Sequence, residues 1–242
     1  MKVLIIIPAF NEEKNILHVV ESVTNLASAY DYLVVNDGST DNTYEVCVRN
    51  NIHVINLPVN LGIGGAMQTG YKYAYRNGYD VAVQLDGDGQ HNPFYVNTMV
   101  EMIKSGQADL VIGSRFLEKQ GFQSTFARRL GIAILRFVIK VFAGLSVSDC
   151  TSGFRACNRE LIKYFAHYYP KDYPEPESIM TISRENFKVV EIPVKMNSRE
   201  HGNSSIVGGK SAYYMVKVLM AMLLDIFKSN KRPLMREEET WL

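Results

Sequence analysis

Cysteine is scarce in this chain, and its few copies are not spaced as a redox pair or a zinc site. The 3 cysteines, Cys47, Cys150 and Cys157, are an odd number with no CxxC motif. This pattern favours reduced, partly buried thiols over a disulfide framework. We therefore expect a cytoplasmic protein.

Neither sign of charge is in excess, because 26 Lys and Arg residues face 25 Asp and Glu residues and leave a net charge of +1. Bulk charge therefore gives no reason to expect a nucleic-acid partner. The fractions of hydrophobic and charged residues, 47% and 21%, are ordinary for a globular protein.

Long apolar runs are also missing. No run reaches the roughly 18 uncharged apolar residues of a membrane span. Charged residues interrupt the two segments that come nearest, 130–147 and 212–227; they are Arg136, Lys140, Lys217 and Asp225. The apolar stretch that ends at Pro8 is too short for a signal peptide and suits a buried first strand.

The first half of the chain alternates strands and helices. Strands are expected at Val3–Ile7, Tyr32–Val35, Ile52–Leu57, Val81–Leu85 and Leu110–Ile112. Helices are expected at Glu12–Ala27, from about Thr40, at Gly64–Tyr75 and at Phe94–Lys104. This order predicts an α/β fold, with a mostly parallel central sheet and helices on both faces.

The second half is less regular. Expected elements are helices at Arg128–Ala143 and Glu177–Arg184, an extended segment at Gly153–Ala156, a strand at Phe187–Ile192, a polar loop at 197–209 and a helix at 211–228. No internal repeat or low-complexity linker divides the chain. We therefore expect a single domain over 1–228 and a charged tail over 229–242.

Two carboxylates follow the fourth predicted strand, in the segment Leu85-Asp86-Gly87-Asp88-Gly89-Gln90. Side chains at i and i+2 of an extended segment share a face, so Asp86 and Asp88 can point the same way. Such a pair repels unless a cation lies between its members. Mg²⁺ takes oxygen ligands and commonly bridges carboxylates to phosphates. The segment therefore predicts a metal–diphosphate site at the carboxyl end of a strand.

Polar loops also follow the first and second strands, at 8–13 and 36–41. Each loop alone is typical of a strand-to-helix turn, with Asn11 as a plausible helix N-cap. All three loops lie at the carboxyl ends of predicted parallel strands, however. They should therefore line the same edge of the sheet as Asp86 and Asp88.

Six segments in order resemble family 2 glycosyltransferases of the GT-A fold, in the branch of dolichol-phosphate-mannose synthases and polyprenyl-phosphate glycosyltransferases. They are 7–12, 35–41, 60–66, 85–90, 113–116 and 149–155. The resemblance covers roughly residues 1–225 and is more specific than any single motif. It implies a metal-dependent, inverting transfer of a sugar from a nucleotide-diphosphate donor, UDP- or GDP-linked. It also implies a nucleotide-sugar half over 1–112 and an acceptor half over 113–228.

Site residues carry over from the resemblance by position. The nucleotide-sugar positions are Pro8, Phe10, Glu12, Val35, Asp37, Leu85, Asp86, Gly87, Asp88, Arg115 and Arg199. Among them, Asp37 is matched to a ring N–H of the base. Asp86, Asp88 and Gln90 are matched to Mg²⁺ or Mn²⁺. Arg115 and Arg199 are matched to the diphosphate, where guanidinium groups neutralise the charge on the leaving group.

The chain departs from the family pattern on both the donor and the acceptor side. Asn36 stands where the family often has an acid, and the loop from Arg199 to Ile206 lacks the usual lysine, which Lys210 could replace. Glu175 and Glu177 match an acidic acceptor-side element, which could equally be a helix start with favourable charge. If the acceptor is a sugar hydroxyl of a cell-wall or capsular polysaccharide, either acid could be the general base. If it is a polyprenyl phosphate, the favoured reading in cell-envelope glycan synthesis, no base is needed.

Two expected helices, near 128–143 and 211–228, are amphipathic, with cationic stripes beside wide apolar faces. The stripes consist of Arg129, Arg136 and Lys140, and of Lys210, Lys217 and Lys228. Core packing would explain the apolar faces, and so would a position at an anionic membrane surface. We expect peripheral attachment to the inner face of the plasma membrane. The oligomeric state stays open, with a homo-oligomer as one alternative.

Rival readings carry less support. Residues 62–67 lack the last glycine of a dinucleotide fingerprint. His91, beside Gln90, is expected to be structural rather than a metal ligand. A nucleotidyltransferase would need a basic, glycine-rich first loop, and an inactive scaffold would not need Asp86 and Asp88.

Overall fold

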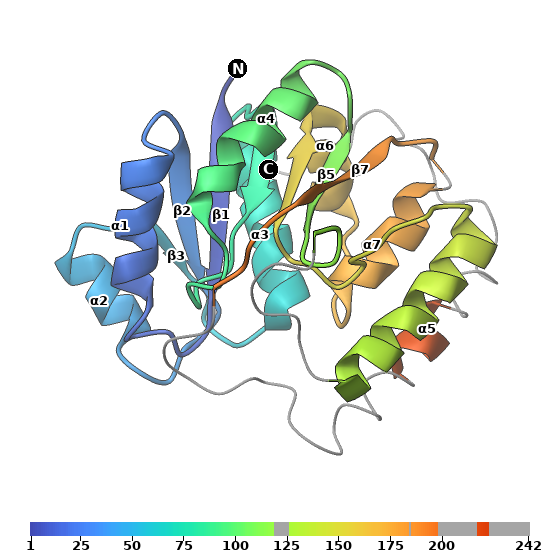
Figure 1. Ribbon diagram of the computed structural model, residues 1–242. Helices are drawn as coiled ribbons and strands as arrows, with labels where there is room; N and C mark the ends of the chain where they lie inside the picture. Colours follow the sequence, from blue (N-terminus) through green and yellow to red (C-terminus); the bar gives the residue numbers. More distant parts are fainter. Residues whose placement is uncertain (119–125, 184, 198–216, 223–242) are drawn as a thin grey trace.

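Buried apolar strands form the centre of the molecule in the computed structural model, which describes residues 1–118, 126–183, 185–197 and 217–222, without the side chains of 126–128 (Figure 1). The strands are β1 (Val3–Ala9), β2 (Asp31–Asn36), β3 (Val54–Asn56), β4 (Val81–Gln84), β5 (Leu110–Ser114), β6 (Arg155–Asn158) and β7 (Val189–Pro193). They make one sheet in the order β3-β2-β1-β4-β6-β5-β7. All neighbouring pairs are parallel except those of β6, which runs antiparallel to β4 and β5.

Helices cover both faces of this sheet, because alternate side chains of each strand point to opposite faces. Leu4 and Ile6 of β1 belong to one core, and Val3, Ile5 and Ile7 belong to the other. The first core is covered by α3 (Gly62–Arg76), α5 (Phe126–Ala143), α6 (Arg159–His167) and α7 (Pro174–Ser183). The second is covered by α1 (Ile16–Leu26), α2 (Thr43–Arg49), η1 (Pro93–Tyr95) and α4 (Val96–Lys104). The predicted α/β fold is confirmed.

Several predicted boundaries were wrong, and one helix was missed. Helix α1 begins at Ile16 rather than Glu12, because Asn11 takes a left-handed conformation with φ of 57° and residues 12–15 form a separate turn. Helix α7 begins earlier than expected, at Pro174, a residue that suits the first turn because it lacks an N–H. Helix α6 had not been predicted.

The second amphipathic helix is described only over 217–222, which are helical. Val218 and Met222, one turn apart, are fully buried in the first core. Core packing therefore explains this part of the apolar face.

Within the described residues, no helix combines the length and hydropathy of a membrane span. The three cysteines are buried free thiols, as expected.

Candidate active site

The loops after β1 and β2 are bound to each other by side-chain hydrogen bonds. Asn11 Oδ1 accepts from the Thr40 N–H at 2.8 Å, and the Asn11 N–H donates to Ser39 Oγ at 2.9 Å. The Glu12 N–H donates to Thr43 Oγ1 at 2.8 Å. Asn11 is therefore not the predicted N-cap; it joins the two loops into one polar rim.

The turn after β4 lies against this rim. The Gly87 N–H donates to the Pro8 carbonyl at 3.2 Å, which brings Asp86 and Asp88 to the end of β1. Asp88 is 7% exposed and its Oδ1 accepts from the Gln90 N–H at 3.0 Å. The Asp86 side chain is 34% exposed. The carboxylates therefore lie on one turn at the expected sheet edge.

His91 supports this turn from inside. Its Nδ1 accepts from the Asp86 N–H at 3.0 Å, and its ring stacks on Phe154 with the centroids 5.0 Å apart. An acceptor Nδ1 puts the proton of a neutral imidazole on Nε2, which lies 3.7 Å from Asp86 Oδ2. The ring therefore fixes the backbone of Asp86 and lies next to its carboxylate.

The residues expected to bind the nucleoside differ in their exposure and in the hydrogen bonds that they already make. Phe10 is 45% exposed, whereas the Val35 side chain is fully buried in the core and is not available to a ligand. Glu12 Oε2 accepts from Asn15 Nδ2 at 2.6 Å. Asp37 Oδ1 accepts from the Leu61 N–H at 2.7 Å, so this carboxylate also holds the start of α3. Burial raises the pKa of the Asp37 carboxyl, while the N–H groups of Leu61 and Gly62 oppose that rise.

Arg115 follows β5 and is held by Asp149, a partner that the sequence did not reveal. Its Nε and Nη2 donate to the two oxygens of Asp149 at 2.7 Å each, and Nη2 also donates to Thr151 Oγ1 at 3.0 Å. Burial works against the charged guanidinium, but the hydrogen bonds and charge of Asp149, helped by the charge of Asp86, raise the pKa of Arg115. Arg115 is therefore a fixed cation on the Asp86 side of the sheet.

Glu175 reaches the same region from the start of α7. Burial raises the pKa of its carboxyl, and the charge of Asp86 adds to the rise, while Arg155 and a hydrogen bond from Gln84 lower it. Gln84 Nε2 also donates to Asp86 Oδ1 at 3.2 Å. Gln84 thus links the carboxylates of Asp86 and Glu175. Glu177 is half-buried within α7, and its carbonyl accepts from Thr181 Oγ1.

Gly153 and Arg155 also belong to this region, although neither is among the site residues predicted from the sequence. Gly153 lies against the Asp86 carboxylate, where a side chain would not fit. Arg155 is 3% exposed and donates to the carbonyls of Ser152, Cys150 and Glu175. Both residues fall in the segment 149–155 that carried the resemblance, so the signal was present in the sequence.

Arg199 and Lys210 lie outside the described residues. Asn197 is the last described residue before them in the sequence; its N–H donates to the Gln90 carbonyl at 2.9 Å, and its Nδ2 donates to the Gly89 carbonyl at 3.4 Å. Gln90 Nε2, matched to the metal by resemblance, donates to the Asn197 carbonyl at 3.5 Å.

The donor set of this turn fits a hard divalent cation. Among the described residues, no group of three or more His, Cys, Asp and Glu side chains is arranged to hold a metal. Asp86 and Asp88 nevertheless supply carboxylate oxygens from neighbouring points of one turn. Mg²⁺ and Mn²⁺ are commonly held by one or two carboxylates together with substrate phosphates, so two acids suffice when a diphosphate is bound.

A mostly parallel sheet with an Asp-Gly-Asp turn beside the ends of β1 and β2 defines the GT-A class of nucleotide-diphospho-sugar transferases. Glucosyl-3-phosphoglycerate synthase from Mycobacterium tuberculosis, solved with Mn²⁺, UDP and glucosyl-3-phosphoglycerate, shares the fold. It aligns with a TM-score of 0.70 at 21% identity, over 93% of this chain and 79% of that one.

The sequence model of glycosyl transferase family 2 matches residues 4–165, and the chain belongs to that family. It is 31% identical to the UDP-N-acetylglucosamine–dolichyl-phosphate N-acetylglucosaminyltransferase of Methanococcus voltae, over 92% of this chain and 98% of that protein. It is 30% identical to the polyprenol monophosphomannose synthase of Mycolicibacterium smegmatis, over 90% of this chain and 85% of that protein. The protein is therefore a glycosyltransferase.

Proposed function

We propose that this glycosyltransferase moves a sugar, with inversion, from a UDP- or GDP-sugar to a polyprenyl phosphate in cell-envelope glycan synthesis. The observation that carries the proposal is the near full-length similarity to enzymes named for transfer to dolichyl phosphate or for polyprenol monophosphomannose synthesis. The sugars in the names of these two relatives differ, N-acetylglucosamine in one and mannose in the other, whereas the lipid phosphate type of acceptor is common to both.

On the donor side, each residue has a proposed role. Pro8, Phe10 and Glu12 hold the nucleoside, and Asp37 accepts a hydrogen bond from the base. Asp86 and Asp88, with Gln90, would hold Mg²⁺ or Mn²⁺, and the backbone of Leu85 and Gly87 shapes their turn. When bound, the cation supplies Lewis-acid stabilisation of the departing nucleoside diphosphate.

Arg115 and Arg199 neutralise the negative charge that grows on the leaving diphosphate. For Arg115 the support is its raised pKa and its fixed orientation against Asp149. A cation that is already oriented needs no reorganisation when the charge develops, so it stabilises the transition state more than the ground state.

The acceptor decides what Glu175 and Glu177 do. A lipid phosphate is already an anionic nucleophile, so these acids would only orient the sugar or a basic side chain. The alternative acceptor is a hydroxyl of a growing polysaccharide, and the raised pKa of Glu175 beside Asp86 favours that second candidate. A carboxylate of raised pKa is a stronger base for the hydroxyl proton.

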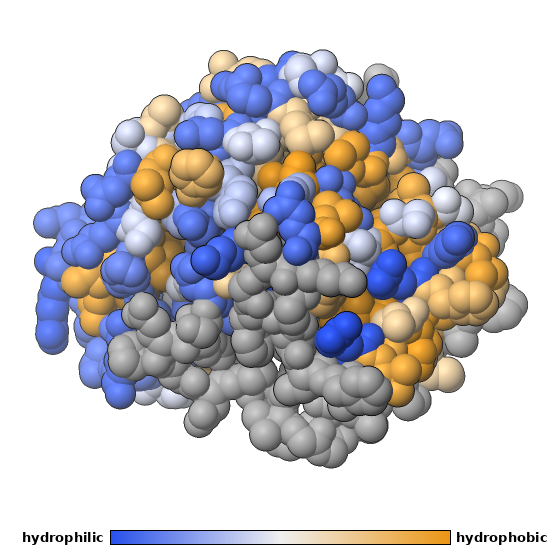
Figure 2. Space-filling view, viewed as in Figure 1, coloured by the Kyte–Doolittle hydropathy of each residue, from blue (hydrophilic) through white to orange (hydrophobic). Residues whose placement is uncertain are grey.

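We also propose that the protein docks on the membrane surface through α5. Five large apolar side chains of this helix are exposed: Leu130, Ile134, Phe137, Val141 and Phe142. Figure 2 shows hydrophobic residues gathered over α5 at the right of the molecule. Arg129 and Lys140 are exposed on the same helix, and cations next to an apolar face suit anionic headgroups.

A donor panel tests the proposed function. UDP-glucose, UDP-N-acetylglucosamine, UDP-galactose, GDP-mannose and dTDP-rhamnose are each incubated with undecaprenyl phosphate and Mn²⁺, and lipid products are resolved. One UDP- or GDP-sugar should yield a sugar–phosphate lipid, with product lost when a chelator removes the metal. Transfer only to a glycan hydroxyl would overturn the lipid-phosphate assignment and leave the alternative.

A further inference from the structure

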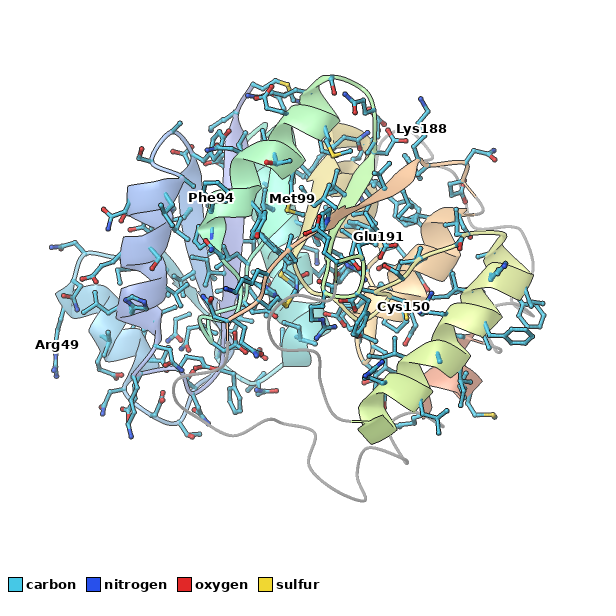
Figure 3. All side chains as sticks on the ribbon, viewed as in Figure 1. Arg49, Phe94, Met99, Cys150, Lys188 and Glu191 are labelled. Carbon is cyan, nitrogen blue, oxygen red and sulfur yellow. The ribbon has the colours of Figure 1, made fainter. Side chains whose placement is uncertain are left out.

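Glu191, in the middle of β7, accepts hydrogen bonds through both carboxylate oxygens from the loop that contains Ser148 and Asp149. Its Oε2 accepts from the Ser148 N–H at 2.6 Å, and its Oε1 accepts from the Ser148 hydroxyl at 2.9 Å and from the Asp149 N–H at 2.8 Å. Glu191 lies beside the loop that carries Cys150 (Figure 3). A half-buried acid on the seventh strand thus fixes two consecutive backbone N–H groups of a segment far away in the chain.

The loop that Glu191 fixes is the one that holds Arg115. Asp149 is fully buried, and while its N–H is held by Glu191, its two oxygens bind Nε and Nη2 of Arg115. A guanidinium bound through two parallel hydrogen bonds takes its direction from the carboxylate. A shift of the Asp149 backbone would therefore turn the Arg115 cation.

A second route leads from Glu191 to the same arginine. The Ser148 hydroxyl lies 2.7 Å from the hydroxyl of Ser114, the residue before Arg115. Because Ser148 donates its single proton to Glu191, Ser114 must be the donor in this pair. Glu191 thus orders both the partner of Arg115 and the backbone next to it.

We infer that Glu191 is a positioning residue for sugar transfer, acting through Asp149 to aim Arg115 at the leaving diphosphate. The inference rests on the proposed function for the role of Arg115. A carboxylate suits this position because both of its oxygens accept, whereas a Gln amide would turn its NH2 group toward the N–H of either Ser148 or Asp149 and lose that hydrogen bond. The loss should fall on kcat, because the charge that Arg115 meets grows in the transition state.

The test compares Glu191→Gln with Glu101→Gln, a matched change at an exposed acid of α4 whose carboxylate pairs with Lys104 at 2.8 Å. Turnover is followed as release of nucleoside diphosphate, which reports transfer to any acceptor, water included. We expect Glu191→Gln to lower kcat by about tenfold or more, with the KM for donor within about threefold. Glu101→Gln should change neither constant.

The variant Arg115→Lys tests whether Glu191 acts by positioning Arg115 or only by stabilising the fold. Lysine keeps the positive charge but cannot form the bidentate hydrogen bonds to Asp149. In the Arg115→Lys background, Glu191→Gln should lower kcat by less than about twofold, since the two residues act in series. Equal losses in both backgrounds, or a loss that follows only the folded fraction measured by thermal unfolding, would overturn the inference. Failure of the proposed function would show earlier, as absent lipid product from the unmodified protein.

Discussion

Gly153 lies against the carboxylate of Asp86, so closely that a Cβ atom at Gly153 would be 3.0 Å from Oδ2 and 3.1 Å from Oδ1. The same Cβ would be 2.8 Å from Gln84 Nε2. Gln84 is buried and closely packed, so we expect an added methyl group to shift the Gln84 amide and the Asp86 carboxylate that it binds.

Gly153→Ala should therefore weaken Mn²⁺-dependent binding of nucleoside diphosphate by about tenfold or more, with a stability cost of about 1–3 kcal/mol. Calorimetric titration and urea unfolding measure the two quantities. Gly106→Ala is the control, because Gly106 has open space around it and a φ of 70°, so that substitution strains only the backbone. Unchanged binding by Gly153→Ala would refute the crowding argument.

Asp88→Asn separates the charge of Asp88 from its structural hydrogen bond. The amide oxygen can still accept from the Gln90 N–H, so the turn should keep its shape. We expect kcat to fall about a hundredfold or more, while the free energy of unfolding changes by less than about 1 kcal/mol. Asp80→Asn, just before β4 at the opposite edge of the sheet, should leave turnover unchanged. Near-normal transfer by Asp88→Asn would contradict the metal role.

The raised pKa of Asp37 predicts a pH dependence of stability. The folded state holds the proton of Asp37 at pH values where the unfolded chain, with its ordinary pKa of 3.8, has lost it. The free energy of unfolding therefore has its Asp37 contribution in full below pH 3.8 and loses it as pH rises through the folded pKa.

In Asp37→Asn this dependence should vanish, while the amide oxygen can still accept from the Leu61 N–H. Urea unfolding at pH values from about 3 to 7 should show wild type losing stability relative to the variant as pH rises. A difference that stays constant with pH, or that changes in the opposite direction, would show that burial does not control this carboxyl.

Membrane docking through α5 predicts different results for two phenylalanines of similar exposure. Phe137 on α5 is 68% exposed, and Phe94 on η1, on the other side of the molecule, is 65% exposed (Figures 1 and 3). Phe137→Ser should weaken binding to anionic vesicles by about tenfold, because burying one such side chain contributes about 1.5–3 kcal/mol. Phe94→Ser should have no effect. Co-sedimentation with vesicles at low salt measures both, and equal losses would exclude α5 as the docking face.

The sequence predicted which loops meet at this edge of the sheet better than it predicted the contacts of Arg115, for a physical reason. Asp86, Asp37 and Glu12 follow strands whose apolar runs are local signals, and parallel strands bring such ends together without further information. The partnership of Arg115 with Asp149 depends on how distant segments meet in space, and no spacing in the chain encodes it.

Two misses in the second half have different causes. The antiparallel direction of β6 depends on long-range connections, so the extended segment at Gly153–Ala156 could be expected but not oriented. Helix α6 had a local signal, because Asn158 caps it through the Leu161 N–H and Leu161, Ile162, Phe165 and Ala166 share its buried face. Its short length made that signal easy to miss.

The place of β6 between β4 and β5 has a consequence for the order of folding. Among the strands that the structure describes, β5 pairs only with β6 and β7, both of which come later in the chain, so it is made before either of these partners. β1, β2 and β4 can pair as soon as they leave the ribosome, whereas β5 joins them only when β6 inserts. Gly153, Asp149 and the Arg115 cation all arrive with that insertion. A growing chain can thus pair β1, β2, β3 and β4 around the donor loops early, but we expect it to transfer no sugar until β6 is in place.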